Sequence, residues 1–441
     1  MVRVLAVAAA CAAAWPVTVP LAVAQTTPSS VLPITVGGPG IRQGRPTEKS
    51  RSALEAESYV APGAPLGSFR LYPTFEFDES YNDNIYATAY GQPGQTGSLI
   101  EEFRPSVELR SIWLNHMVNL FANGDIAFYN ASNLANYQDF SVGGEGRVDL
   151  DRDDHILVAG GFFRLHDAPG APSSPVGQTV PVPYNQGVAS LGYVHTFNNL
   201  VVRVDGRLDR YAWLFNVLGP AQGSIYNTDR DRLELREALR IGYRFSPDYQ
   251  VWVRGGANQR RYDVTFDALG YDRSSTGWDA VLGVTMDFGG ITALELWGGW
   301  AQQNYEDWRL TNLSMPTFGM ALYWNPLRQL IVKSFVHRTV EEAATVAANG
   351  YVNTLIGMNI SYELRPNVSL AVFGSYAIID YLPVLGYPYE VDNYLSFGAG
   401  INYYLTPRVF IGPSYQYTTR SSNVSVGYSQ NLVMLRLGSR L

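Results

Sequence analysis

The 441-residue sequence predicts an all-β protein, a transmembrane antiparallel up-and-down β-barrel of about 18 strands. Three observations predict this fold class. From residue 69 onward, segments of roughly nine to fourteen residues alternate apolar and polar side chains, which is the period of a strand with one apolar face. Short turns recur roughly every 40 residues, with longer polar loops between them, as in outer-membrane barrels. The 29 Tyr, 19 Phe and 42 Gly, with only 16% charged residues, also favour strands.

Residues 1–24 are expected to be a secretory signal peptide. One early cation, Arg3, precedes an apolar stretch, and the small residues Ala22-Val23-Ala24 form a typical cleavage site. An uncleaved membrane anchor is the alternative, although two prolines within the stretch disfavour it. Cys11 is the single cysteine and lies in this signal, so the expected mature chain has no disulfide to stabilise it.

Residues 25–66 are rich in Pro, Gly and Ser and show no sustained period, so we expect a flexible periplasmic segment. A tail that docks a partner is the alternative. The barrel is then expected to occupy residues 67–441. No run of about eighteen apolar residues follows residue 24, so the mature chain would cross a membrane with strands. The net charge of -7 gives no electrostatic reason to bind nucleic acid.

The segment Arg230 to Phe245, RDRLELREALRIGYRF, could be read either as a helix or as a strand. Its Leu, Glu, Arg and Ala favour a helix, but its odd positions from 233 to 245 are apolar except Glu237, and most even positions are charged. Period two therefore predicts a strand, the eighth of the barrel, with leucines toward lipid and arginines toward the lumen. Glu237 would face lipid at mid-strand and cost up to a few kcal/mol unless a β-bulge turned it away, so we expect an irregularity there.

Eight short turns join the expected strands into nine hairpins, which places both ends of the barrel on the periplasmic side. The turns are expected at Leu114–His116, Arg152–Asp154, Asn198–Asn199, Ser246–Asp248, Gly289–Gly290, Asn325–Arg328, Arg365–Asn367 and Thr406–Arg408. At seven of the eight turns the outward phase carries an aromatic residue, as expected for a girdle at the lipid headgroups: Trp113, Phe197, Phe245 with Tyr249, Phe288, Trp324, Tyr362 and Tyr403. The last strand also alternates outward apolar and inward polar residues. The barrel assembly machinery, which commonly recognises a terminal strand that ends in an aromatic residue, is an expected partner, although this chain ends in Leu441.

The start of the expected barrel, FRLYPTFEFDESYNDNIYAT, resembles the opening of a family of β-barrel porins of Gram-negative bacteria. The matching residues are Phe69, Leu71 and Pro73, followed by Tyr81 and Asp83-Asn84-Ile85-Tyr86. The segments NYQDFSVGGEGRVDLDRDD, YNTDRDRLELREALRIGYRFSP, WNPLRQL and YQYTTRSS are also similar and occur in family order. The resemblance implies a single barrel in the outer membrane, and its members are often linked to exopolysaccharide export.

Charged side chains are expected to line the lumen. The early strands mix both signs and include Glu102, Glu108, Asp139, Glu145 and Asp205. The eighth and ninth strands add Arg232, Arg236, Arg240, Arg244, Arg254 and Arg260. Because charged rings set selectivity in a water-filled barrel, this wall is expected to steer an anionic or sugar-acid solute through arginine forks. The alternative is that opposite charges on neighbouring strands simply pair.

Aromatic residues are also expected to face the lumen, where they would stack on sugar rings or pack against their neighbours: Tyr72, Trp252, Tyr262, Trp297, Tyr323, Tyr394 and Tyr404. We expect no enzymatic activity, because the five histidines are scattered and no serine motif accompanies them. We expect no cofactor and no metal, since the acidic clusters DLDRDD and DESYNDN lack the spacing of a calcium loop.

These features together predict a monomeric channel in the outer-membrane bilayer for a hydrophilic solute, with a secreted polysaccharide as one candidate. A non-conducting barrel that serves as a structural or assembly partner of an envelope or exopolysaccharide complex is the second hypothesis. A barrel-embedded lipid hydrolase using His195 or His337 is the third. Two loops, Tyr90–Ser98 and Pro169–Pro183, are long enough to fold into the lumen.

Overall fold

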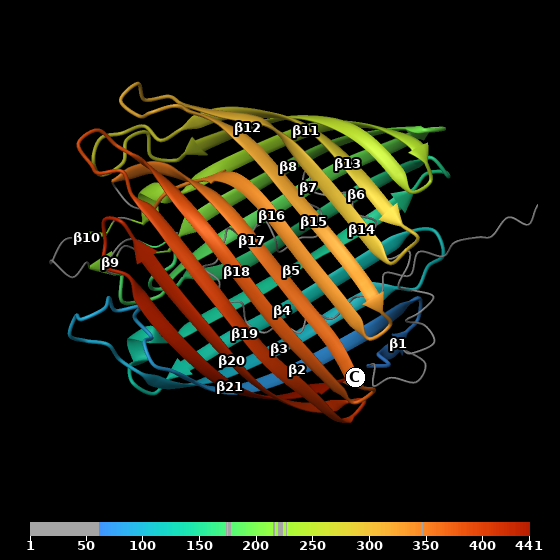
Figure 1. The fold of residues 1–441 in the computed structure, drawn as a ribbon, viewed down its shortest axis with the longest axis horizontal. Helices are drawn as coiled ribbons and strands as arrows, with labels where there is room; N and C mark the ends of the chain where they lie inside the picture. The colour runs from blue at the N-terminus through green and yellow to red at the C-terminus, as the bar shows by residue number, and fades with distance from the viewer. Residues whose placement is uncertain are drawn as a thin grey trace, which may run out of the picture.

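The computed structural model describes residues 61–441 apart from 173, 175–177, 215–216, 219–223, 226 and 345–346. The expected signal peptide and most of the expected periplasmic segment lie outside these residues. The described chain forms one antiparallel sheet of 19 strands, and removing the three-residue strand β1 (Ala64–Leu66) leaves a closed barrel of 18 (Figure 1). The predicted fold class and strand number are confirmed.

The barrel strands in chain order are β2 (Phe69–Asn82), β3 (Ser98–Ser111), β4 (Met117–Tyr129), β5 (Tyr137–Asp149), β6 (Asp154–Asp167), β7 (Val182–Phe197), β8 (Leu200–Trp213), β11 (Arg232–Ser246), β12 (Tyr249–Tyr262), β13 (Ser275–Phe288), β14 (Thr292–Tyr305), β15 (Leu313–Leu327), β16 (Leu330–Glu341), β17 (Ala348–Arg365), β18 (Val368–Pro383), β19 (Val391–Thr406), β20 (Val409–Ser422) and β21 (Tyr428–Arg440). Short elements in the loops are β9 (Val217–Leu218), β10 (Ser224–Ile225), η2 (Asn133–Ala135) and η3 (Thr228–Arg230). No helix in the described part of the chain is long and apolar enough to cross a membrane.

The barrel closes where its first and last long strands pair. β2 pairs with β21 from Thr74 opposite Arg440 to Asn82 opposite Leu432. The first residues of β2 pair instead with β1, so β1 occupies the place beside β2 that β21 leaves beyond its end. The start of the barrel and the C-terminus therefore lie at the same end (Figure 1).

The two ends of the barrel differ in the length of their connections. All eight predicted short turns join consecutive strands, and five of them, including Asn198–Asn199 between β7 and β8, have only two residues between the strands. Asn198 has a φ of 53° and Gly289 one of 59°, values that these residue types tolerate in tight turns. The nine longer connections lie at the opposite end, which is extracellular in barrels of this kind.

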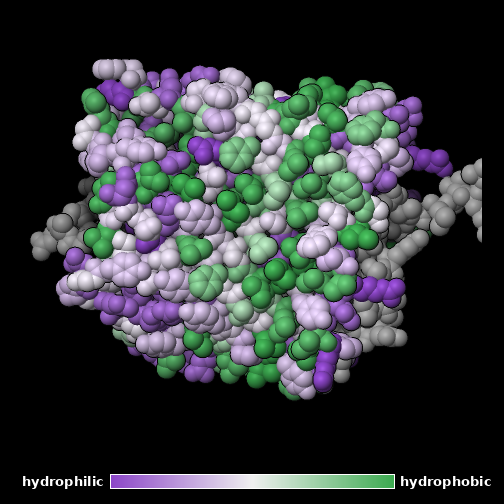
Figure 2. All heavy atoms as spheres, viewed as in Figure 1, coloured by the Kyte–Doolittle hydropathy of each residue, from purple (hydrophilic) through white to green (hydrophobic). Residues whose placement is uncertain are grey.

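The outer wall carries the apolar phase of the strands. Figure 2 shows hydrophobic residues spread over this surface. Most residues of the predicted girdle are exposed at the short-turn end, for example Phe245 at 59% and Trp324 at 42%, whereas Tyr249 and Tyr362 are half-buried. A soluble protein would bury such side chains. Because they are exposed around the barrel, they form the apolar surface that a bilayer covers.

The segment Arg230 to Phe245 forms β11, the eighth barrel strand, as predicted, but the irregularity expected at Glu237 is wrong. Glu237 lies directly opposite Gly206 and Ala257 in unbroken register, and the β11–β12 pairing shifts only between Arg244 and Ser246. Glu237 is eight residues from Phe245, so with a tilt near 40° it lies roughly 20 Å above the periplasmic girdle. That height is close to the outer edge of the apolar band, so its carboxylate reaches headgroups without a bulge.

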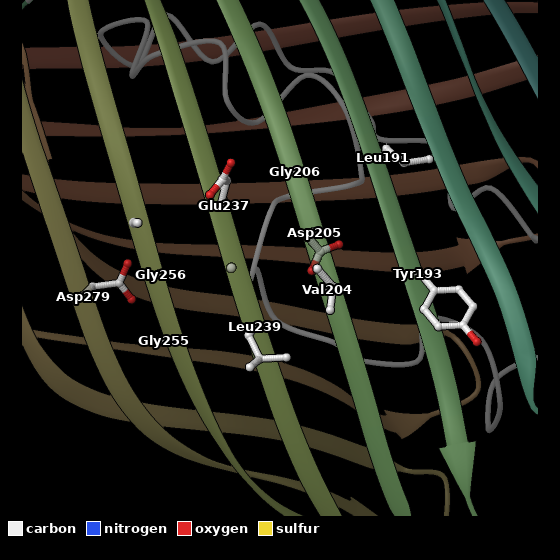
Figure 3. Close-up of a pocket in the computed structure, with 12 residues that line it drawn as sticks. Leu191, Tyr193, Val204, Asp205, Gly206, Glu237, Leu239, Gly255, Gly256 and Asp279 are labelled. Carbon is white, nitrogen blue, oxygen red and sulfur yellow. The ribbon is translucent and has the colours of Figure 1, made fainter.

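The wall around Glu237 is thin, since its neighbours have little or no side chain. Figure 3 shows Glu237 and Leu239 on β11 beside Val204 and Gly206 on β8 and Gly255 on β12, around a hollow of about 630 Å³. Higher on the same outer face, Leu233 lies between Arg210 and Arg261, so charged residues become common at this height.

On the inner wall, aromatic rings lie over glycines of the next strand. In five pairs the ring and the glycine are direct cross-strand partners: Trp252 with Gly283, Trp297 with Gly319, Phe335 with Gly357, Phe373 with Gly398, and Phe410 with Gly438. A Cβ atom at Gly319 would lie 1.9 Å from the Trp297 ring. Glycine is therefore required there so that the ring can lie against the sheet.

Candidate functional site

The arginines of the inner wall are held by carboxylates on their own strands. Because residues two apart share a face of a strand, Arg203 pairs with Asp205 at 2.7 Å. On β11, Glu234 lies between two arginines and receives Arg232 at 2.8 Å and Arg236 at 2.5 Å. These short-range pairs neutralise much of the basic wall.

Three more arginines pair with acids far away in the sequence. Arg240 reaches Glu295 on β14 at 3.0 Å and lies over the Trp252 ring, 3.9 Å from its centroid. Arg254 pairs with Asp279 at 2.5 Å, and Arg260 pairs with Glu342. Five of the six predicted arginines thus have a carboxylate partner, in line with the alternative that opposite charges pair. Arg244, near the periplasmic end, has no ion pair among the described residues.

The acids predicted on the other strands also lie in polar pairs. Glu102 and Glu108 pair with Arg104 and Arg110, each two residues further along β3. Asp139 contacts His166 at 2.9 Å. Glu145 faces Asn119 across the β4–β5 ladder. The predicted residues are therefore on the inner wall, but they form local ion pairs and polar contacts and not one continuous field.

The loop between β6 and β7 folds into the mouth of the barrel. The hydroxyl groups of Tyr394 and Tyr428 each donate a hydrogen bond to the Gly170 carbonyl at 3.1 Å. Tyr394 belongs to β19, which is seven strands from β6 around the barrel, so the loop reaches over much of the opening. Gly170 has a φ of 80°, and a Cβ there would lie 2.4 Å from Ala87 in the β2–β3 loop. The loop expected at Pro169–Pro183 therefore folds into the mouth, where Gly170 meets the β2–β3 connection at Ala87, just before the expected loop Tyr90–Ser98.

A third loop enters from the other side. In the β16–β17 loop, the Glu342 carboxylate accepts hydrogen bonds from Arg260 and, at 2.7 Å, from the Tyr262 hydroxyl on β12. Ala343 of the same loop packs in a buried cluster with Tyr351, Tyr381, Tyr394 and Tyr428. The extracellular end of the lumen is consequently narrowed by loops, whereas at the periplasmic end the described strands are joined by short turns.

The predicted lumen aromatics divide into covered and accessible rings. Trp252 and Tyr394 are only 2% and 5% exposed, and Tyr262 is bound to the inward-folded loop. Half-buried rings remain at Tyr72, Trp297, Tyr323 and Tyr404, of which Tyr72 and Tyr404 lie under the guanidinium groups of Arg110 and Arg440. Trp297 and Tyr323 carry no such cation from an arginine in the described residues.

The histidines do not assemble a hydrolytic site. His195 contacts the Asp154 carboxylate at 2.5 Å, and Asp154 also accepts a hydrogen bond from Tyr193. These three side chains lie on the outer face near the periplasmic turns, and no serine takes part in their contacts in the described chain. His337 stacks on Phe335, with ring centroids 5.7 Å apart. Within the described residues, no group of three or more His, Cys, Asp or Glu side chains suits a metal ion.

An exposed ion pair marks the extracellular rim. The two hydrogen bonds from Arg210 to Asp263, at 2.6 and 2.5 Å, hold the pKa of the Asp263 carboxyl below its ordinary value. Since both side chains face solvent, this pair contributes little to stability.

A closed 18-strand barrel with an apolar outer wall, a polar lumen and inward-folded loops is an outer-membrane barrel of the porin type. Residues 57–441 match the model of the family described as "Putative beta-barrel porin 2", and the chain belongs to that family. No curated protein matches the sequence. Among solved structures, OpdO of Pseudomonas aeruginosa is 14% identical with a TM-score of 0.44, covering 85% of this chain and 98% of its own.

Two other solved barrels have comparable similarity. OpdK of Pseudomonas aeruginosa, solved with vanillate, is 11% identical with a TM-score of 0.43, covering 84% of this chain and 99% of its own. The siderophore receptor PirA of Acinetobacter baumannii is 10% identical with a TM-score of 0.40, covering 84% of this chain and 80% of its own. The protein is an outer-membrane porin-like channel.

Proposed function

We propose that the barrel conducts hydrophilic, preferentially anionic solutes, and that segments of a secreted polysaccharide bearing acidic sugars are its cargo. The observation that carries this proposal is the asymmetry of the lumen. Its extracellular end is narrowed by loops, whereas its periplasmic half presents half-buried aromatic rings with the cation Arg244. Because most other arginines are neutralised by partners, the preference for anions is modest.

The test is the conductance of the refolded chain in planar bilayers at two salt gradients. An anion-preferring current that loses its preference in Arg244→Gln, but keeps it in Arg210→Gln on the outer rim, supports the proposal. A cation-preferring current in the unmodified chain rejects it.

A second candidate function is a non-conducting barrel that serves as a structural part of an envelope complex. The contacts of Gly170 with Tyr394 and Tyr428 favour it, since they hold a loop inside the mouth. Correctly folded protein that never conducts, in the unmodified form or after these tyrosines are replaced by phenylalanine, would support this candidate and exclude the first.

A further inference from the structure

The outer face of three adjacent strands carries two arginines near the extracellular rim. Leu233 of β11 is the direct cross-strand partner of Arg210 on β8 and of Arg261 on β12. Leu233 is exposed on the lipid-facing wall, and cross-strand partners share one face of a sheet, so both arginines point out of the barrel. Their ligand therefore lies outside the barrel wall and not in the lumen.

Arg210, Arg261 and Asp263 form what we call the rim cluster, and its net charge is positive. Arg210 reaches across β11 to Asp263, two residues beyond Arg261, and its two hydrogen bonds to this carboxylate neutralise one cation. Arg261 is exposed and has no ion pair among the residues that the structure describes. Its neighbour is neutral, since the Gln259 amide, oriented to satisfy its hydrogen bonds, accepts from Arg261 Nε at 3.0 Å. One positive charge of the rim cluster is thus left to attract an anion.

Neutral polar side chains continue the outer face beside the rim cluster. Gln259 pairs across the ladder with Thr276 of β13, and Thr276 pairs with Asn304 of β14. Gln302, two residues before Asn304, donates a hydrogen bond from its amide to the Asn304 side chain at 2.8 Å. Amides and hydroxyls both donate and accept hydrogen bonds, as sugar hydroxyls do. The outer face at this height therefore suits a headgroup that carries hydroxyls as well as negative charge.

Below the rim cluster, toward the periplasm, lies the hollow of about 630 Å³ (Figure 3). Leu191, Val204 and Leu239 border it with exposed apolar side chains. Gly206 and Gly255 keep it open, because a Cβ atom at either residue would meet nothing within 4 Å. An apolar hollow on the lipid-facing wall suits a hydrocarbon chain.

The Glu237 carboxylate lies between the hollow and the rim cluster. Its cross-strand partner Ala257 pairs in turn with Trp278, whose exposed ring marks the edge of the apolar band. Leu233 is four residues further along β11, so the rim cluster is about 10 Å higher at a strand tilt near 40°. An ionised carboxylate only accepts hydrogen bonds, so a lipid at this height has to supply a donor. The sugar backbone of a glycolipid has hydroxyl and N–H donors, whereas the ester region of a phosphoglyceride has none.

We propose that the outer face of β8, β11 and β12 binds one phosphorylated, acylated sugar of the extracellular leaflet. An acyl chain fills the hollow, the sugar backbone donates a hydrogen bond to Glu237, and a phosphate binds Arg261 with the remaining N–H groups of Arg210. Arginine suits this role because its planar fork matches phosphate oxygens. The inference concerns the lipid-facing wall and is independent of whether the barrel conducts.

The experiment is a titration of the purified barrel in detergent, with bound lipids counted by native mass spectrometry. The probe is diphosphoryl lipid A, alongside dioleoylphosphatidylethanolamine. We expect diphosphoryl lipid A to bind at least about tenfold more tightly, because a hydrogen bond to a charged group is worth about this factor. Arg261→Gln should weaken its binding about tenfold and Arg261→Lys should weaken it less. Asp263→Asn should strengthen it, because the carboxylate that competes for Arg210 is removed.

The hollow is tested by Gly255→Val, which fills it from the middle and should also weaken binding of diphosphoryl lipid A. The matched control is Arg338→Gln on the distant strand β16, where the guanidinium group pairs with Asp380 at 3.7 Å. It should leave binding unchanged, and a heat-shifted gel band confirms the folding of each variant.

Three results would each overturn the inference: equal binding of dioleoylphosphatidylethanolamine and diphosphoryl lipid A, equal effects of Arg261→Gln and Arg338→Gln, or weaker binding in Asp263→Asn. Because lipid binding and conductance are measured separately, a silent channel that binds diphosphoryl lipid A would reject the proposed function alone.

Discussion

Replacement of Gly319 by alanine is expected to destabilise the barrel, because the new methyl group would lie 1.9 Å from the Trp297 ring. Carbon atoms need about 3.5 Å or more, so the ring has to leave the sheet or the two strands have to separate. Overpacking of this kind typically costs about 1 to 3 kcal/mol. The outer-face Gly255→Ala is the matched control, since a Cβ there meets nothing within 4 Å.

The double-mutant cycle with Trp297→Ala isolates this contact. Once the ring is removed, the alanine methyl group at residue 319 fits, so the double variant should be more stable than the sum of the single effects by about 1 to 3 kcal/mol. The assay is urea unfolding in lipid vesicles, with the folded fraction read from heat-modifiable gel mobility. A Gly319→Ala cost no larger than that of Gly255→Ala, or strictly additive effects in the cycle, would refute this explanation of the glycine.

Three further predictions concern charge and the mouth of the barrel. Glu342→Gln leaves the buried Arg260 without its carboxylate and should lower the free energy of unfolding by about 3 kcal/mol or more. Asp263→Asn, at the exposed rim pair, should lower it by less than about 1 kcal/mol, and urea unfolding measures both variants. Glu237→Leu should change the free energy of unfolding by no more than about 1 kcal/mol, because the side chain lies at the edge of the apolar band. A gain of about 2 kcal/mol or more is expected for a residue at the bilayer midplane and would contradict this placement. The double variant Tyr394→Phe, Tyr428→Phe removes two hydrogen bonds to the loop in the mouth, worth roughly 2 kcal/mol in total. The open fraction of the channel should therefore increase about thirtyfold. Unchanged single-channel recordings would count against a loop that restricts passage.

The sequence predicted the strands and the short turns well, since both depend on local physics. Alternation of side chains fixes which face of β11 meets lipid, and tight turns at Asn198–Asn199 or Gly289–Gly290 need residues that tolerate positive φ. The irregularity at Glu237 was wrongly expected because the residue was placed at mid-strand, in the middle of the apolar band. Its neighbours Gly206 and Ala257 and its distance from Phe245 became clear only with the register.

The candidate site could be predicted only in part, because its decisive contacts are distant in sequence. The pairing of Arg232 with Glu234 is readable at a spacing of two residues. The partners of Arg240 and Arg260 are Glu295 and Glu342, and no local pattern indicates them. Whether a long loop folds inward is likewise set by contacts with opposite walls, such as those at Gly170.

The aromatic residues illustrate the same limit. Trp252 and Trp297 have the same phase and both lie over a glycine, so periodicity treats them alike. Only the three-dimensional arrangement covers the Trp252 ring with Arg240 and leaves the Trp297 ring half-buried.

The most direct test of the central claim is the single-channel conductance of residues 25–441, refolded and inserted into a planar bilayer. We predict discrete current steps with a modest preference for anions that decreases in Arg244→Gln. Folded, heat-modifiable protein that produces no steps, or steps that prefer cations, would contradict a channel for anionic hydrophilic solutes.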